Sequence, residues 1–493
     1  MNTGRFERTL KFGVFALVTL LFTYKLDYHY FFTDEILYVQ RGIEQFSGIF
    51  GDTLQVPPLP KYFAGLLYKI VGNNLGLLRL PYAVMGIISA YIIYRIIKRE
   101  YNSYYGLIGA LLYSTSRIIL DATRMVMLEP MLHLFWLLFL YYHYEIFLEV
   151  KRKYVYLIAG VFLGLSLSVK LTSLVLLPLV FIGFLLQRRT KRVPISTAIK
   201  NYVLMLAAAS GVILLTYVHF IYKEGIFIAI SDTIKAVKSA YLSKSAEGKR
   251  HVIGNNVYEK SPWWTYIFYF IQYNGVIRML VFVLLTVLAF FRKKLYVLYW
   301  GMFLLFILVF HQFSGVKNVR YISSIEIPLV VLSVAGLNFL FQRFGKSKYF
   351  LSLAILVGIF LIYRQLSYLR NLQYTEYLGL YRYFKNETSD FTLFKRMYIF
   401  GSVRSIRYYR DTAPNGDMIL WRRDYELMCP EFDNFDFFAF DSEELAMEPT
   451  NTLYKYVKAN EEHFERVREI KDMVVYKKLG PFKSVFDCSQ VSK

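Results

Sequence analysis

The sequence has few cysteines and few acidic residues. Only two cysteines, Cys429 and Cys488, occur among 493 residues, so at most one disulfide could form, and disulfides are not the main source of stability. Charged residues make up only 19% of the chain, and Asp and Glu together number 36 against 58 Lys and Arg, a formal net charge of +22. Such an excess can indicate nucleic-acid binding, but the placement of the charges, described below, argues against it.

We expect no cleavable signal peptide at the start of the sequence. Residues 1–11 are a short basic start that leads into an apolar segment without a small-residue cleavage pattern. We therefore expect a first helix that stays in the mature chain.

Apolar residues dominate what is present. Hydrophobic residues make up 56% of the chain and aromatic residues 18%, the mean hydropathy is +0.36, and the apolar residues are concentrated in long blocks. This composition predicts a polytopic membrane protein. Counting runs long enough to cross a hydrocarbon core of roughly 30 Å gives about eleven spans. They lie near residues 12–32, 80–97, 104–120, 126–147, 154–169, 172–187, 202–222, 264–290, 294–311, 321–341 and 348–365.

The basic clusters sit at the ends of these blocks and all fall on one side when the amino end is placed inside. They lie at residues 95–100, 149–153, 187–192, 291–294 and 342–348. This distribution is a topology signal, because cytoplasmic loops carry an excess of Lys and Arg. The segments predicted to lie outside are 33–61, 121–124, 223–263, 311–320 and the whole carboxyl-terminal tail.

The composition changes after about residue 368 to mixed charged and polar, which predicts a transmembrane domain over 1–367 and a soluble outer domain over 368–493. We expect a small α/β layer in the tail. Its expected helices lie at 380–383, 404–409 and 453–467, and its expected strands at 395–402, 435–440 and 473–477. Asn386 begins a glycosylation sequon on the outer side. The turn at Gly401 lacks the further glycines of a phosphate fingerprint.

The polar loop 33–61, within an outer segment 33–79, carries the first candidate site residues. Asp34 and Glu35 follow the first apolar run directly, where a membrane helix reaches water, and such a position suits a general base. At the other end three prolines at positions 57, 58 and 60 stiffen the backbone before Lys61, which suits an anion site. The alternative is an ordinary loop with solvated charges.

Ionisable residues at membrane depth or at the outer lip are costly and are functional candidates by default. They are Arg79, Arg124, Glu129 and Lys170. The alternative for the cations is snorkelling to lipid headgroups, and for Glu129 a carboxylate favoured by the helix dipole beside Pro130. Arg124 and Glu129 are five positions apart, about 140° on a helix, and so are not expected to form an ion pair with each other.

Together these residues suit one chemistry. Outer-lip carboxylates, cations on the same side and an apolar bundle could bind a lipid-borne phosphate and activate a hydroxyl nucleophile. Because neighbouring residues on a helix point about 100° apart, only one of Asp34 and Glu35 is expected to act as the base.

At this point the sequence resembles the membrane glycosyltransferases of the GT-C fold, in particular the protein O-mannosyltransferases and the lipid A aminoarabinose transferases. The matching motifs are, in order, Asp34-Glu35 after the first helix, the proline-rich loop ending in Lys61, Arg79, the pattern from Arg124 to Leu132, the small-residue run 164–170, the aromatic segment 261–264 and the segment 317–321. Val56, Pro60 and Glu129 stand where the family has histidine, glycine and aspartate. These departures affect the acceptor class more than the fold.

The resemblance implies a bundle that moves a sugar, mannose or another hexose, from a polyprenyl or dolichyl phosphate to a hydroxyl of a protein, glycan or lipid at the outer face, with inversion. It implies Asp34 as the catalytic base, Glu35 as a supporting acid, and no metal or cofactor besides the donor substrate. The implied donor-phosphate ligands are Lys61, Arg79, Arg124, Lys170 and Arg320; Glu129, Trp263, Trp264 and Tyr321 would bind the acceptor or support the site.

Two other functions are compatible with the composition. A transporter or lipid flippase would be expected to show internal repeats and polar residues near the midplane, and neither is found in the sequence. A catalytically inactive scaffold that presents the tail would tolerate substitution of both Asp34 and Glu35. The sequence leaves open the sugar, the acceptor, the oligomeric state, the role of the tail and whether the two cysteines pair.

Overall fold

The computed structural model forms two compact units, each described by itself. The described residues are 3–28, 33–50, 56–72, 74–148, 152–191, 194–237, 251–253, 256–258, 261–292, 294–313, 317–345, 348–371, 397–400, 437–441, 452–470 and 473–479. The first unit comprises residues 1–27, 38–246 and 261–372, and the second residues 28–37, 247–260 and 373–493. The boundary between them falls within the second helix.

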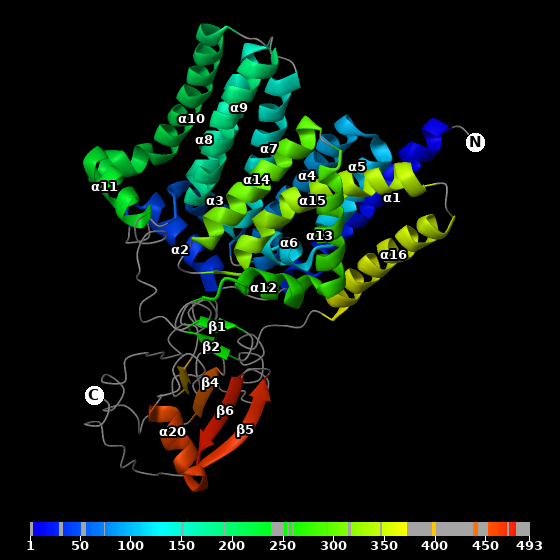
Figure 1. The fold of residues 1–493 in the computed structure, drawn as a ribbon. Helices are drawn as coiled ribbons and strands as arrows, with labels where there is room; N and C mark the ends of the chain where they lie inside the picture. Colours follow the sequence, from blue (N-terminus) through cyan, green and yellow to red (C-terminus); the bar gives the residue numbers. More distant parts are fainter. Residues whose placement is uncertain are drawn as a thin grey trace. The chain divides into compact units, whose positions relative to one another are not determined.

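The first unit is helical (Figure 1). Its first half contains α1 (Thr3–Thr23), η1 (Leu26–Tyr28), α2 (Thr33–Phe46), α3 (Pro58–Val71), α4 (Leu75–Glu100), α5 (Ser103–Ser114), α6 (Arg117–Thr123), α7 (Leu128–Leu148), α8 (Lys153–Val169) and η2 (Leu171–Val175). Its second half contains α9 (Leu176–Lys191), α10 (Ile195–Glu224), α11 (Ile226–Val237), α12 (Thr265–Asn274), α13 (Val276–Phe290), α14 (Leu295–Gln312), α15 (Arg320–Phe344) and α16 (Lys348–Arg370).

A helix lies at each of the segments predicted to be apolar spans, but not every one is long and apolar enough to cross a membrane alone. Within the described ranges four helices meet that test, α4, α10, α14 and α15, and up to six spans result if each bent helix pair counts as one. The bent pairs are α6 with α7, at 108°, and α12 with α13, at 116°. Multiple apolar helices confirm a multi-pass membrane protein, whereas the count of eleven stays a prediction.

Local sequence explains where the helices start and break. Asn74 and Asn102 cap α4 and α5 by accepting the backbone N–H three residues on, and Ser116 caps α6 in the same way. Gly275 separates α12 from α13 with a φ of 83°, a left-handed conformation that glycine adopts without strain. The expected outer turn at 121–124 is instead mostly the last turn of α6, and the break follows at Arg124.

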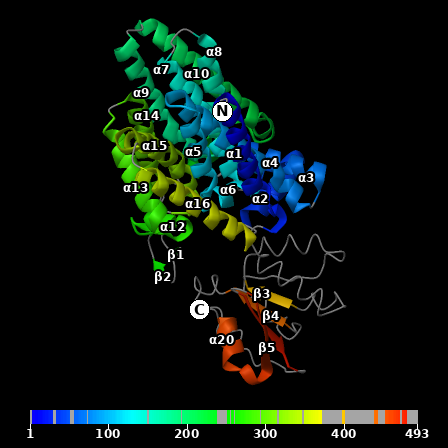
Figure 2. The same cartoon turned by 90° about the vertical axis from the view of Figure 1, so that its right-hand side faces the viewer.

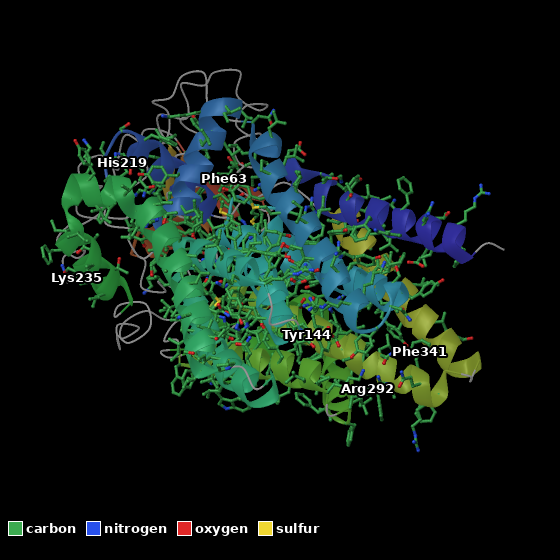
Figure 3. All side chains as sticks on the ribbon, turned by 90° about the horizontal axis from the view of Figure 1, so that it is seen from above. Phe63, Tyr144, His219, Lys235, Arg292 and Phe341 are labelled. Atoms are coloured by element: carbon green, nitrogen blue, oxygen red, sulfur yellow. The ribbon has the colours of Figure 1, made fainter. Side chains whose placement is uncertain are left out.

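Helix α15 is the core of the first unit. In its most apolar window 72% of the residues are buried, against 22% for α10 at the edge. It packs on α13, α14 and α5, while α8 packs between α7 and α10 (Figure 1) and α1 runs along α4 and α5 (Figure 2). Viewed from above, His219 and Lys235 mark one side of this unit and Arg292 and Phe341 the other (Figure 3).

Small residues allow the closest helix contacts. A Cβ atom on Gly160 of α8 would lie 2.1 Å from the carbonyl oxygen of Met205 on α10, and one on Gly336 of α15 would lie 1.8 Å from the carbonyl oxygen of Leu285 on α13. A backbone carbonyl cannot move aside to relieve such a clash, as a flexible side chain can. These glycines therefore set the spacing of two helix pairs.

The second unit contains strands β1 (His251–Ile253), β2 (Asn256–Tyr258), β3 (Met397–Phe400), β4 (Phe437–Asp441), β5 (Phe464–Ile470) and β6 (Met473–Lys478), with α20 (Thr452–Ala459) and η7 (Glu461–His463). β1 and β2 form an antiparallel pair, and the other four strands form a sheet in the order β3-β4-β6-β5, in which only β3 and β4 are parallel. Its core is Phe438, Phe440, Val457, Phe464 and Tyr476.

Strands lie where the tail was expected to have them, but the helix expected over 453–467 is wrong in its second half. The helix ends at Ala459, and β5 begins at Phe464. Phe464, Val467 and Ile470 are separated by charged residues, and the segment pairs antiparallel with β6, so tertiary pairing overrides local helix propensity. The segments 380–383 and 404–409, the sequon at Asn386, Gly401 and both cysteines lie outside the described residues, so the complete α/β domain stays a prediction.

We predict that Gly160→Ala destabilises the bundle by about 1–3 kcal/mol, because the new methyl group meets backbone. Gly211→Ala on α10, where nothing lies within 4 Å of the added atom, is the control. It should leave the thermal midpoint unchanged or raise it, since alanine favours helix by up to about 1 kcal/mol. Equal midpoints for the two variants in detergent would contradict this packing.

Candidate functional site

Two buried arginines hold the turn that follows α1. Arg79 on α4 donates to the carbonyl of Leu26 at 2.7 Å. Arg124, at the end of α6, donates to the carbonyl of Tyr24 and, at 3.2 Å, to that of Lys25. Both arginines are 0% exposed. Because helix ends leave carbonyls without partners, the guanidinium groups satisfy carbonyls just past the end of α1 and fix the turn at residues 24–26.

This geometry adds a structural role to two residues predicted to bind phosphate. Neither arginine snorkels, since both are fully buried. Arg124 keeps Nε and Nη1 without a hydrogen-bond partner in the described part of the chain. The guanidinium group of Arg124 therefore binds the turn through Nη2 alone, and its Nε and Nη1 can donate to a further acceptor.

Glu129 and Lys170 form a buried ion pair. Glu129 lies in the first turn of α7, and Lys170 lies just past the end of α8 in extended conformation. The Lys170 Nζ to Glu129 Oε1 distance is 2.9 Å, and the two side chains are 13% and 1% exposed. Each sits where a helix dipole favours its charge. The expectation that Arg124 does not pair with Glu129 agrees with this arrangement, since Glu129 pairs with Lys170 instead.

Aromatic rings extend this pair toward α15. Lys170 Nζ lies 4.6 Å from the centroid of the Tyr321 ring, which stacks on His311 at 4.9 Å. His311 Nε2 is 3.2 Å from the hydroxyl of Ser324. One turn after Glu129, His133 lies between Tyr113 and Ser323, with ring nitrogens 3.2 and 3.1 Å from their hydroxyl oxygens. The structure thus brings Glu129, Lys170 and Tyr321 together.

The neighbouring predicted residues lie at the starts of α12 and α15. The side chain of Asn318 accepts from Arg320 N at 3.0 Å and Nε at 3.3 Å, which fixes the arginine at the start of α15. Lys317 Nζ donates to the carbonyl of Pro262 at 2.8 Å and so ties the two segments together. Trp264 occupies the N-cap position of α12 without a side-chain capping hydrogen bond, whereas Trp263 is 70% exposed.

Lys61 is buried by a close helix contact. A Cβ atom on Gly42 of α2 would lie 2.1 Å from the carbonyl oxygen of Lys61, so the two backbones touch there. Burial, with a smaller contribution from the charge of Arg41, lowers the pKa of Lys61 to about 7, and the Glu44 carboxylate opposes this shift. An anion bound beside Lys61 would stabilise the charged form of the lysine and so oppose the effect of burial.

Asp34 and Glu35 lie in the first turn of α2, in the part of that helix that belongs to the second compact unit. Glu35 is 2% exposed, and Asp34 is half-buried. Carboxylates in a first turn are also stabilised by the helix dipole. The roles assigned to the two residues therefore stay proposals.

A buried network at the break between α12 and α13 was not among the features predicted from the sequence. Arg278 and Glu326 form an ion pair at 3.8 Å with side chains 2% and 0% exposed. Asn274 donates to Glu326, and Arg278 donates to the carbonyl of Thr115 at 3.0 Å. The rule that pointed to Arg79, an ionisable residue inside an apolar run, applies equally to Arg278 and Glu326 and could have found them.

Within the described ranges no group of three His, Cys, Asp or Glu residues is placed to hold a metal ion. The expectation of a metal-free site stays a prediction.

Comparison with solved structures defines the fold. ArnT from Cupriavidus metallidurans, in a crystal structure bound to undecaprenyl phosphate, matches with a TM-score of 0.57 at 13% identity, over 97% of this chain and 99% of that one. The oligosaccharyltransferase AglB from Archaeoglobus fulgidus, in complex with an inhibitory peptide and a dolichol-phosphate, matches with a TM-score of 0.56 at 10% identity, over 98% of this chain and 75% of that one. The fold is that of the GT-C glycosyltransferases.

Comparison with protein families narrows the class. Residues 55–217 match the family model described as dolichyl-phosphate-mannose-protein mannosyltransferase, and this range includes Lys61, Arg79, Arg124, Glu129 and Lys170. No curated protein sequence matches. The family model matches less than half of the chain, and the solved structures show a fold shared along almost all of it.

We predict that Glu129→Gln lowers the free energy of unfolding by about 3–5 kcal/mol, because the Lys170 ammonium is left buried without its carboxylate. The double variant Glu129→Gln/Lys170→Met should recover much of this loss. Glu145→Gln, which removes the partner of Arg99 in a pair 30% and 23% exposed, is the control and should cost at most about 1 kcal/mol. A double variant as unstable as the single one would show that the pair is not the cause.

We also predict a pH effect of Lys61. Its pKa is about 7 in the folded protein and near 10.5 in an unfolded chain, so between these values the unfolded state binds more protons. Stability should therefore rise with pH in this window, by up to about 1.4 kcal/mol per pH unit. Lys61→Met should remove this rise, and Lys69→Met, at an exposed position of α3, should keep it. The measurement is the thermal midpoint of each protein from pH 7 to 10. Parallel pH dependences for wild type and Lys61→Met would show that burial does not lower the pKa of Lys61.

Proposed function

We propose that the protein transfers a sugar, mannose or another hexose, from a polyprenyl or dolichyl phosphate to an acceptor hydroxyl at the outer membrane face. The observation that carries the proposal is the match of residues 55–217 to the mannosyltransferase family model within a fold shared along almost the whole chain with ArnT. Both the ArnT and AglB structures hold a polyprenyl-type phosphate, which supports a lipid-linked donor here.

In the proposed reaction Asp34 removes the proton of the acceptor hydroxyl. The hydroxyl oxygen then attacks the anomeric carbon, and the bond from that carbon to the phosphate oxygen breaks on the opposite face. The configuration inverts, and the lipid phosphate leaves with the bonding electron pair. Positioned acid–base groups contribute about 10²–10⁴-fold to such steps. Glu35, adjacent to Asp34 on α2, supports it.

The leaving phosphate needs positive charge in a site of low dielectric constant. Lys61 supports this role because it is 2% exposed and shares its surroundings with Arg41. Arg124 supports it through Nε and Nη1, which have no hydrogen-bond partner among the described residues. Lys170 is already paired with Glu129, so a phosphate would compete with that carboxylate for the ammonium. We assign Arg79 mainly to positioning, and Arg320 to the phosphate at the start of α15.

The acceptor is proposed to be a hydroxyl of a protein, glycan or lipid. The exposed ring of Trp263 and the stacked ring of Tyr321 offer apolar faces against which a sugar ring can pack. Glu129 and Trp264 support these elements from the starts of α7 and α12. The predicted topology has eleven spans in a prokaryotic cell membrane, a cytoplasmic amino terminus and an outer carboxyl-terminal domain.

The test is transfer of labelled sugar from synthetic polyprenyl-phosphate donors to a membrane extract by purified, reconstituted protein. We predict that Asp34→Asn lowers transfer by about 10²–10⁴-fold while donor binding persists, because the base is lost and the cations remain. Asp232→Asn on α11, whose partner is Lys235 at the surface, is the matched control and should keep full transfer.

Two outcomes would contradict the proposal. Full transfer by Asp34→Asn would remove its role as the base. Failure of the wild-type protein to bind or transfer any common sugar donor would instead favour a transporter or flippase.

A further inference from the structure

Three cations gather between α1 and α4 at the end of the bundle where the chain begins. Lys11 Nζ lies 5.2 Å from the centroid of the Tyr94 ring and 5.6 Å from that of Tyr91. Lys98 Nζ lies 5.6 Å from the Tyr94 centroid. Arg95 Nη1 donates to the Tyr91 hydroxyl at 3.4 Å. Two helices far apart in sequence thus place three positive charges around two rings.

The carboxylates of the described residues do not neutralise this cluster. Among the described residues, Lys98 of the cluster pairs with Glu7 at 3.9 Å, and the two side chains are 46% and 40% exposed. Such a pair contributes about 0–1 kcal/mol. Neither Lys11 nor Arg95 forms an ion pair with a carboxylate of the described residues. The cluster therefore carries an excess of about two positive charges.

An apolar stripe leads along α4 to this cluster. The stripe consists of large side chains exposed on one face of α4, at intervals of three or four residues: Leu77 47%, Leu80 39%, Val84 42%, Ile88 41% and Tyr91 37% exposed. Intervals of this kind keep residues on one side of a helix. The next positions on the same face are the exposed Arg95 and Lys98. The face changes from apolar to cationic at Tyr91.

The order of side chains on this face matches that of a lipid. Tyrosine is enriched where the hydrocarbon region meets the headgroups, and basic residues just beyond it attract anionic headgroups by about 1 kcal/mol each. Phe12, which follows Lys11 on α1, is 77% exposed. A free phosphate ion would use the cations but leave the stripe without a role.

We propose that the α1–α4 face is a binding site for an anionic phospholipid of the leaflet on the amino-terminal side. The headgroup phosphate accepts hydrogen bonds from Lys11 and Arg95, Lys98 adds positive charge, and the acyl chains lie along the stripe from Ile88 toward Leu80. The site is independent of the proposed sugar transfer. It would anchor α1 against α4, and with it the turn that Arg79 and Arg124 hold.

The test uses the full chain in nanodiscs of phosphatidylcholine with and without phosphatidylglycerol. The lipid retained after gentle detergent extraction is measured by native mass spectrometry. Wild-type protein should retain phosphatidylglycerol over phosphatidylcholine by at least about tenfold, from about 1 kcal/mol per cation. The variant Lys11→Gln/Arg95→Gln/Lys98→Gln should lose this preference. The control variant Lys153→Gln/Lys200→Gln/Arg343→Gln removes the same charge from exposed positions at the ends of α8, α10 and α15 and should keep it.

Equal retention of both lipids by the wild type, or equal loss of preference in both triple variants, would overturn the proposal. Displacement of the retained lipid by soluble glycerol phosphate would do so as well, because the acyl chains would then contribute nothing. Thermal midpoints in pure phosphatidylcholine should agree between wild type and both triple variants. If the first triple variant does not fold, the single variants Lys11→Gln and Lys98→Gln should each show a partial loss of preference, and unchanged preference in both would count against the site.

Discussion

Charges buried in an apolar bundle must find partners, and the candidate site depends on this constraint. A buried charge without a partner costs several kcal/mol. Arg79 and Arg124 find theirs in the carbonyls of the turn after α1, which are themselves unsatisfied at a helix end. The arginines thus gain hydrogen-bond acceptors, and the carbonyls gain donors. The same contacts join the turn after α1 to α4 and to the break between α6 and α7.

The sequence could predict that these arginines matter but not what they touch. Their presence in apolar surroundings was sufficient to select them, and a phosphate was the partner that their charge suggested. Backbone carbonyls are present at every residue, so no sequence pattern distinguishes the ones at Tyr24 and Leu26. Lys170 was easier to predict from the sequence, because it interrupts an apolar run. In the structure α8 ends just before it. Its partner Glu129 lies 41 positions earlier, and only packing of α7 on α8 brings the two together.

Apolar length was a good guide to where helices lie and a poor guide to where they bend. The expected span 264–290 is broken at Gly275, whose left-handed backbone was visible in the sequence only as one glycine after an asparagine. The bend leaves the backbone carbonyls of Tyr273 and Asn274 to accept from Arg364, while the side chain of Asn274 donates to Glu326, the partner of the missed residue Arg278. Breaks and buried ion pairs therefore occur together here. In the tail, β5 was missed for the opposite reason, since its pairing with β6 is not a local property.

Burial also decides how loss of activity can be interpreted. Glu129 and Lys170 hold each other's charge inside the bundle, so removing either one perturbs the packing of α7 and α8 whether or not it contacts the substrate. Asp34 differs in burial, because it is only half-buried in the first turn of a helix. A defect at Asp34 in a stable protein therefore bears on chemistry, whereas a defect at Glu129 bears on chemistry only after the stability of the variant has been matched to that of the wild type.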